Sequence, residues 1–235
     1  MTFFDPQPDL VLFDLDDTLC DYAGARVGRL RIAFELAEQQ SGERLTAPLD
    51  EIVQESIRIQ PHGVDHFPAM LARYGIDDPA AVEAAVRWFV GHRFHGLQLF
   101  PDAIETLEVV RAAKPGRRLG LITNGPAEVQ TAKIELLGVL PYVDFALISG
   151  VFGFWKPDRQ IFEEALSLGD ASASESVMIG DSPEHDMAGA EAAGIATIWI
   201  DHNVRRWPDE LPSPTFIAPN LATVRQLLAN PHPVD

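Results

Sequence analysis

The sequence predicts an α/β protein with a doubly wound (Rossmann-like) parallel sheet and a helical domain inserted into it. Five short aliphatic runs stand out, at 10–13, 119–123, 145–149, 177–179 and 195–200. Each run is apolar on both faces, which is typical of a strand buried in a parallel sheet. Helical patterns at 128–137, 158–168 and 184–193 separate the last four runs. Strands that alternate with helices in this way favour right-handed βαβ crossovers.

The segment between the first two strands differs from the other connections. From about residue 22 to residue 97 it shows helical periodicity, and apolar residues from Val27 to Ala37 recur at spacings of three and four. A single crossover helix does not need so long a segment. We therefore expect a core at 1–20 and 98–235 and an inserted helical domain at 21–97. A further strand at 215–217 and a helix at 221–228 extend the core.

Composition and charge exclude several functional classes. The 235 residues include 18 basic and 35 acidic side chains, so the net charge is −17. A chain this acidic repels nucleic acid and anionic lipid. No basic leader and no apolar run of membrane-spanning length is evident, and the one cysteine, Cys20, fits a reducing compartment. We expect a cytoplasmic monomer or homodimer without nucleic-acid or membrane partners.

Polar residues follow four of the predicted strands. They are the groups at 14–18, 123–125, 155–157 and 180–186. In open α/β sheets, ligands bind beyond the carboxyl ends of the strands, where these groups converge. That edge therefore gathers carboxylates, a hydroxyl, an amide and a lysine.

Two pairs of aspartates indicate a cation. Asp14 and Asp16 are two residues apart, so an extended backbone would place both on one face. Carboxylates this close repel each other, and Mg²⁺ removes the repulsion and prefers such oxygen ligands. Asp181 and Asp186 follow another strand. A solvated acidic turn is the alternative for the first pair, and a role at a helix N-terminus is the alternative for Asp186.

Thr123, Asn124 and Lys156 are candidates for binding an anion. Thr123 and Asn124 precede a Gly-Pro turn, and Lys156 precedes a Pro-Asp helix start. Helix N-termini attract anions, although a plain N-cap and a surface lysine are the alternatives. The four aspartates with Lys156 carry a net charge of −3, which repels a phosphate dianion. Mg²⁺ brings it to −1, and one protonated carboxyl makes it neutral, so the metal is a condition for substrate binding.

In order and spacing, these four groups resemble the motifs of the haloacid dehalogenase superfamily. Residues 14–18 match its Asp-x-Asp-x-Thr motif, Thr123 its second motif, Lys156 its third, and Gly180-Asp181 with Asp186 its fourth. The inserted helices resemble the α-helical cap domain of the phosphoglycolate-phosphatase-like branch. In that branch the cap determines substrate specificity.

The resemblance implies a Mg²⁺-dependent phosphatase acting on a small phosphorylated metabolite. Asp14 would be the nucleophile that forms an aspartyl phosphate, and Asp16 the general acid and then the base. Thr123, Asn124 and Lys156 would hold the phosphoryl oxygens. Asp14, the main-chain carbonyl of Asp16 and Asp181 would bind the metal, and Asp186 would support them.

The cap residues that the resemblance suggests for substrate contact are Arg58, His62, His66 and Arg73, with Tyr22 at the entrance. Three alternatives stay open. A 2-haloacid dehalogenase would use the same nucleophile without a metal, and Asp16 and Asp181 disfavour it. A phosphomutase would exclude water from the aspartyl phosphate. A catalytically retired binding protein would lack a part of the site, whereas every motif is present.

Overall fold

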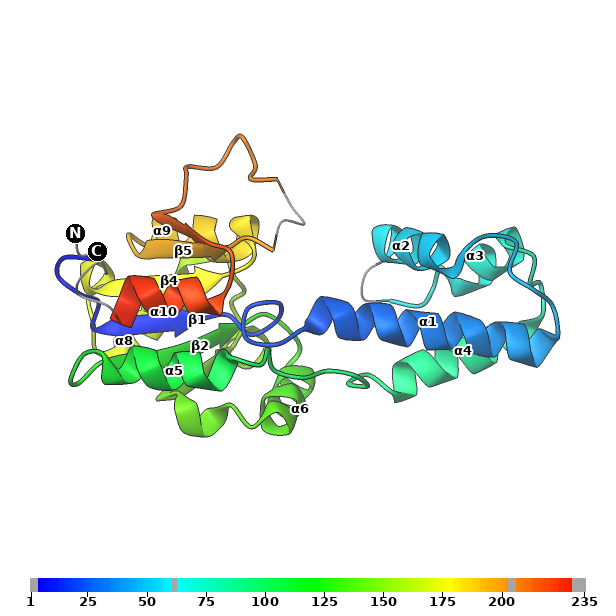
Figure 1. The fold of residues 1–235 in the computed structure, drawn as a ribbon, viewed down its shortest axis with the longest axis horizontal. Coiled ribbons are helices and arrows are strands. Elements are labelled where there is room, and N and C mark those ends of the chain that lie inside the picture. The colour runs from blue at the N-terminus through cyan, green and yellow to red at the C-terminus, as the bar shows by residue number, and fades with distance from the viewer. Residues whose placement is uncertain (1–3, 61–62, 203–205, 230–235) are drawn as a thin grey trace. The chain divides into compact units, whose positions relative to one another are not determined.

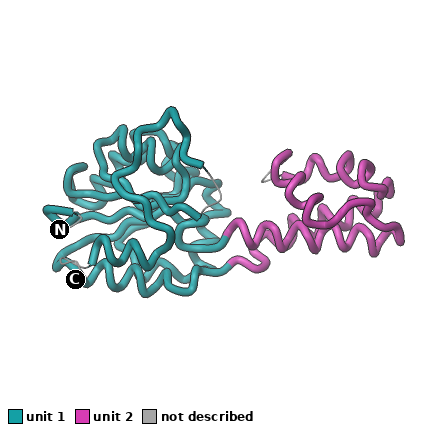
Figure 2. Tube along the Cα trace, turned by 45° about the horizontal axis from the view of Figure 1, so that its top comes forward, with its two compact units in different colours: residues 1–21, 98–235 teal, residues 22–97 magenta. Residues whose placement is uncertain are grey.

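The computed structural model describes residues 4–60, 63–202 and 206–229. The chain divides into two compact units, which Figure 2 shows in different colours. We call Met1–Asp21 with Gln98–Asp235 the sheet unit, and Tyr22–Leu97 the helical unit. Within the described ranges, no helix is both long and apolar enough to cross a membrane.

The sheet unit contains a six-stranded parallel sheet in the order β3-β2-β1-β4-β5-β6 (Figure 1). The strands are β1 (Leu10–Phe13), β2 (Arg118–Thr123), β3 (Phe145–Ile148), β4 (Ser176–Gly180), β5 (Ala196–Ile200) and β6 (Phe216–Ala218). This confirms the α/β fold class and the six predicted strands, whose ends differ from the prediction by at most one residue. The strand order places β2 and β4 on either side of β1, so the residues after these three strands are neighbours.

Helices cover both faces of the sheet. Leu10 and Leu12 of β1 lie in an apolar cluster with α8 (Arg159–Gly169) and α9 (Ala188–Ala192). Because side chains alternate along a strand, Val11 and Phe13 point to the opposite face. Helices α5 (Ala103–Ala112) and α10 (Leu221–Ala229) pack against each other there, in front of the sheet in Figure 1. The remaining helical elements of this unit are α6 (Ala127–Leu137), α7 (Ser149–Phe152), η1 (Leu140–Tyr142), η2 (Ala173–Glu175) and η3 (Pro183–Met187).

Two elements differ from the sequence prediction. Helix α5 was not predicted, although Ala103, Leu107 and Val110 are buried at helical spacing. The helix predicted at 184–193 begins instead with η3, a π-helical turn, and only then continues as α9. The carbonyl of Ser182 accepts from the amides of both Asp186 (2.9 Å) and Met187 (3.2 Å). The second bond is the i→i+5 bond of a π-turn, which is frequent at functional sites.

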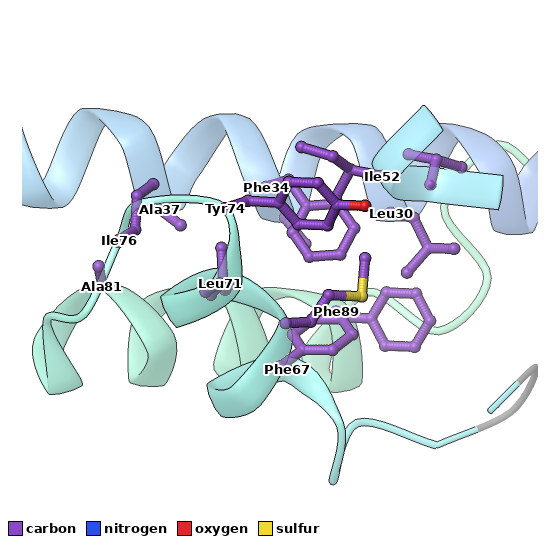
Figure 3. Packing of buried hydrophobic residues seen from close by; sticks show 14 residues of the cluster. Leu30, Phe34, Ala37, Ile52, Phe67, Leu71, Tyr74, Ile76, Ala81 and Phe89 are labelled. Atoms are coloured by element: carbon purple, nitrogen blue, oxygen red, sulfur yellow. The ribbon is translucent and has the colours of Figure 1, made fainter. Parts of the chain in front are cut away.

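The helical unit has its own core. Its helices are α1 (Tyr22–Ser41), α2 (Leu49–Ile59), α3 (Phe67–Arg73) and α4 (Pro79–Gly91), and no strand lies among its described residues. Phe67 is fully buried, with its ring centroid 5.1 Å from that of Phe34 and 5.7 Å from that of Phe89 (Figure 3). Aromatic contacts of this kind join α1, α3 and α4 into one packed body.

We expect Phe67→Ala to destabilise the helical unit by about 3–5 kcal/mol, because it removes a buried ring and leaves a cavity. Denaturant unfolding of the full chain measures the effect. Val90→Ala, at a half-exposed position of the same unit, is the control, and it should change the free energy of unfolding by less than about 0.5 kcal/mol. Equal losses for the two variants would contradict this account of the core.

Candidate active site

A buried lysine joins two aspartates at the carboxyl edge of the sheet. The Nζ of Lys156 lies 2.5 Å from Oδ1 of Asp14 and 2.6 Å from Oδ1 of Asp186. Its third bond, of 2.9 Å, goes to the carbonyl oxygen of Ile122 on β2. Lys156 is 3% exposed and Asp186 1%. An ammonium group has three donors, and all three are used here, which is how a charge of this kind tolerates burial.

Asp14 follows directly after β1, and its surroundings both raise and lower the pKa of its carboxyl group. Its backbone amide donates to the carbonyl of Ile179 on β4 at 2.9 Å. Burial raises the pKa of the Asp14 carboxyl to about 7, and the carboxylates of Asp186 and Asp16 add to the rise, while Lys156 opposes it. Desolvation therefore outweighs the ion pair with Lys156 in setting this pKa.

The same two carboxylates also change the pKa of Lys156. Burial alone would lower the pKa of its ammonium group, but the carboxylates of Asp14 and Asp186 outweigh burial and raise this pKa. Lys156 is therefore charged at neutral pH, and it neutralises only one of the two aspartates that it contacts.

Three aspartates lie close enough to share a metal ion. One carboxylate oxygen from each of Asp14, Asp181 and Asp186 lies within 4.8 Å of the others. Asp186 has both oxygens engaged, Oδ1 with Lys156 and Oδ2 with the amide of Ser182 at 3.1 Å. Oxygen ligands at this spacing suit a hard divalent cation.

Gly180 is required for this arrangement. A Cβ atom at Gly180 would lie 2.2 Å from Oδ2 of Asp186, so no side chain fits at this strand end. The main chain beside it is also fixed, because the indole Nε1 of Trp199 on β5 donates to the carbonyl of Asp181 at 2.9 Å. The π-turn and the missing side chain together bring Asp186 back against the end of β4.

Asp16 lies outside the three-aspartate group and has partners of its own. Both of its carboxylate oxygens accept from the Nζ of Lys133, at 2.8 and 2.6 Å, and Oδ2 also lies 3.2 Å from Nε2 of Gln130. The next residue, Asp17, has a positive φ of 59°, so the chain is no longer extended after Asp16. The Asp16 side chain is therefore paired with helix α6, whereas Asp14 is paired with Lys156.

Thr123 and Asn124 end β2 beside these groups. The hydroxyl oxygen of Thr123 accepts from Nε2 of Gln130 at 2.8 Å, which leaves its own O–H able to donate. The side chain of Asn124 is used differently: its Nδ2 donates to the carbonyl of Lys156 (2.8 Å), and its Oδ1 accepts from the amide of Lys156 (2.9 Å). Asn124 thus fixes the backbone that carries Lys156.

Gln130 and Lys133 are the site residues that the sequence analysis missed. They lie three residues apart on α6, and both are buried, at 2% and 3% exposure. A sequence signal was present, because the chain has only three lysines, and Lys133 is one helical turn from a glutamine that follows the Thr123 strand end. With Lys133 included, the four aspartates and two lysines carry a net charge of −2. One divalent cation balances this charge without a protonated carboxyl.

Two of the residues predicted to contact substrate, His66 and Arg73, contact other side chains of the helical unit. Nε2 of His66 is hydrogen-bonded to Oγ of Ser56 at 2.7 Å, and Arg73 is paired with Glu55. Arg58 is exposed, and His62 lies outside the described residues.

Tyr22 begins α1 and contacts two arginines. The guanidinium carbons of Arg26 and Arg29 lie 5.7 and 6.0 Å from the centroid of its ring. Arg29 is buried and lies 4.7 Å from the ring centroid of Phe89, so its charge is packed among aromatic rings.

Comparisons with known proteins identify the family of this chain. Residues 8–194 match the model of the haloacid dehalogenase-like hydrolases. The chain is 35% identical to a glyceraldehyde 3-phosphate phosphatase of Methanopyrus kandleri, over 81% of this chain and 82% of the relative. It is 32% identical to a ribulose-1,5-bisphosphate 5-phosphatase of Halopiger xanaduensis, over 92% of both chains.

A solved structure extends the comparison to another reaction. A 2-haloacid dehalogenase from Pseudomonas syringae pv. Tomato superposes with a TM-score of 0.59 at 32% identity, and the match covers 94% of this chain and 98% of the dehalogenase. The match to the family model spans most of the sheet unit and all of the helical unit. The chain therefore belongs to the haloacid dehalogenase-like hydrolases.

Proposed function

We propose that the protein is a metal-dependent phosphatase that hydrolyses a small phosphorylated metabolite through an aspartyl phosphate on Asp14. The observation that carries the proposal is the buried Asp14 carboxylate, whose oxygen lies 2.5 Å from Lys156 beside two further aspartates. An oriented carboxylate with local positive charge is what phosphoryl transfer needs, since the reaction depends on positioning and charge neutralisation. The two relatives named as phosphatases support this choice.

The reaction has two halves. In the first, a carboxylate oxygen of Asp14 attacks phosphorus, and the leaving alcohol takes a proton from Asp16. In the second, Asp16 takes a proton from water, the water oxygen attacks phosphorus, and the Asp14 carboxylate is released with inorganic phosphate. The O–H of Thr123 donates to a phosphoryl oxygen. Lys156 orients Asp14 and supplies positive charge, and the side chain of Asn124 holds the backbone of Lys156 in place.

The carboxylates fit a divalent cation, and Mg²⁺ is the ion we propose. Asp14 and Asp181, with the main-chain carbonyl of Asp16, would hold it, while Asp186 supports them through Lys156 and Ser182. When bound, such an ion supplies charge neutralisation at the phosphoryl oxygens. The net charge supports this assignment, because the four aspartates and two lysines of the site sum to −2, which one divalent cation balances.

Sugar phosphates are the substrate class we propose, since both phosphatase relatives are named for phosphorylated sugars. Selection of the substrate by the helical unit stays a prediction. Three further expectations also stay predictions: the cytoplasmic location, the absence of nucleic-acid and membrane partners, and the monomeric or dimeric state. A panel of phosphorylated metabolites assayed for released phosphate tests the substrate class, and no turnover of any member would refute the function.

The second candidate is a 2-haloacid dehalogenase, favoured by the 32% identity to one such enzyme. That reaction would use Asp14 on carbon and does not need a metal. The grouping of Asp14 with Asp181 and Asp186 favours the phosphatase. Halide release from 2-chloropropionate, measured with and without EDTA, decides between the two. A phosphomutase differs only in the fate of the aspartyl phosphate, and transfer of phosphate to a second hydroxyl would reveal it.

We expect Asp14→Asn to lower turnover of 4-nitrophenyl phosphate by about 10⁴-fold or more, the scale seen when a covalent nucleophile is removed. The variant should remain folded, because asparagine keeps the size of the side chain and removes a charge that burial disfavours. Kinetics and a thermal melt at about pH 8, above the raised pKa of Asp14, measure both effects. An active variant would refute the nucleophile assignment.

We expect Mg²⁺ to raise the melting temperature more at about pH 8 than at about pH 5.5, because metal binding needs ionised Asp14. The folded pKa of Asp14, about 7, exceeds its ordinary value of 3.8. Its proton therefore stabilises the metal-free fold at low pH, and this contribution is lost as the pH rises through 7.

The control for the Mg²⁺ experiment is Asp14→Asn, which has no proton to lose at this position. Its response to Mg²⁺ should be smaller and should not grow between the same two pH values. A wild-type shift that is identical at both pH values would contradict the role of Asp14 as a ligand.

A further inference from the structure

Two side chains of α6 converge on Asp16, the acid and base of the proposed reaction. Lys133 reaches both carboxylate oxygens, at 2.8 and 2.6 Å, and Gln130 reaches Oδ2 at 3.2 Å. Residues three apart on a helix share a face, so one face of α6 makes all three contacts. This is a second lysine–aspartate pair, distinct from the one between Lys156 and Asp14.

The ion pair between Lys133 and Asp16 lies largely inside the protein, because the Lys133 side chain is buried. The Lys133 side chain is 4% exposed, while that of Asp16 is 25% exposed. An ammonium group is buried to this degree only when it is paired, and surface pairs contribute little. The chain has three lysines, and the third, Lys114, forms a more exposed pair with Asp9, ahead of β1. Two of the three lysines are thus buried against aspartates of the site.

Gln130 connects Asp16 to the end of β2. Its Nε2 lies 2.8 Å from the hydroxyl of Thr123 and 2.6 Å from the carbonyl of Asn124. Gly125 makes room for it, because a Cβ atom there would lie 2.6 Å from Cγ of Gln130. Through Gln130, helix α6 therefore contacts both the Asp16 carboxylate and the end of β2, where Thr123 carries the proposed phosphate-binding hydroxyl.

We propose that Lys133 is a positioning residue that holds the Asp16 carboxylate in place for the second half of the reaction. This inference rests on the proposed phosphatase function. In that half Asp16 takes a proton from water, and the water oxygen forms a bond to phosphorus. The bond from phosphorus to the Asp14 oxygen breaks, and its electron pair returns to the Asp14 carboxylate.

The geometry points to the second half because Asp16 acts here only as an acceptor. A carboxylate whose two oxygens both accept from Lys133 is held in one orientation, as a base that takes a proton from water must be. The first half with 4-nitrophenyl phosphate does not depend on Asp16, because nitrophenolate leaves without a proton. This substrate therefore separates the two halves of the reaction.

The experiment compares the wild-type chain with Lys133→Met in steady-state and rapid-mixing assays on 4-nitrophenyl phosphate. Loss of base positioning should lower kcat by about 10-fold or more, which is part of the roughly 10²–10⁴-fold that general base catalysis contributes. The ratio kcat/KM should stay within about twofold, because it reports the first half only. Aspartyl phosphate should then accumulate, giving a burst of nitrophenolate close to one per active site.

Two further variants make the test specific. Lys133→Arg keeps a donor for Asp16 and should restore part of kcat and reduce the burst. Lys114→Met removes the lysine of the exposed pair outside the site, and its kcat and kcat/KM should match the wild type. Thermal melts show that each variant is folded.

Unchanged kcat without a burst in Lys133→Met would overturn the inference. So would a fall in kcat/KM without a burst, since a general structural role of Lys133 would produce that pattern. Failure of the proposed function looks different: the wild-type chain itself would then release neither nitrophenolate nor phosphate.

Discussion

The burial of two carboxylates, those of Asp14 and Asp186, at one sheet edge is the constraint on which the rest of the site depends. Like charges in a low dielectric repel each other, and each loses its hydration. Lys133 and Lys156 are themselves buried, and each donates to aspartate oxygens. Burial still outweighs the ion pair with Lys156 and raises the pKa of Asp14 to about 7. One oxygen from each of Asp14, Asp181 and Asp186 lies within 4.8 Å of the others, which is close enough for the three to share a divalent cation.

The strand order brings Lys156 and the residues after β1, β2 and β4 to one place. Strand β1 lies next to β2 and β4, so Asp14, Thr123 and Asp181 come from neighbouring strand ends. Lys156 comes after β3, the second strand from β1, with helix α7 between β3 and Lys156. Its side chain reaches Asp14, and its ammonium group donates to the carbonyl of Ile122 on the intervening strand β2. Asn124, also from β2, holds the backbone from which it starts.

Sequence reasoning found the parts of the site that local rules determine. Asp14, Thr123 and Asp181 follow buried strands, and the carboxyl-edge rule for parallel sheets brings them together. Sequence reasoning missed Gln130 and Lys133 because they lie inside a helix, where a polar residue ordinarily faces solvent. Their burial follows from how α6 packs beside the end of β2, and this is a tertiary contact that periodicity does not encode.

The same reason accounts for the remaining differences. Two aspartates on one extended strand would share a face, but the positive φ of Asp17 shows that the strand has already ended. Strand β1 ends at Phe13, so Asp14 and Asp16 both lie beyond it, and each contacts a different lysine. The side chain of Asp14 is 9% exposed and that of Asp16 is 25% exposed. Unequal burial and separate partners allow two neighbouring carboxylates to differ in chemistry, and the proposed mechanism assigns them the roles of nucleophile and acid-base group.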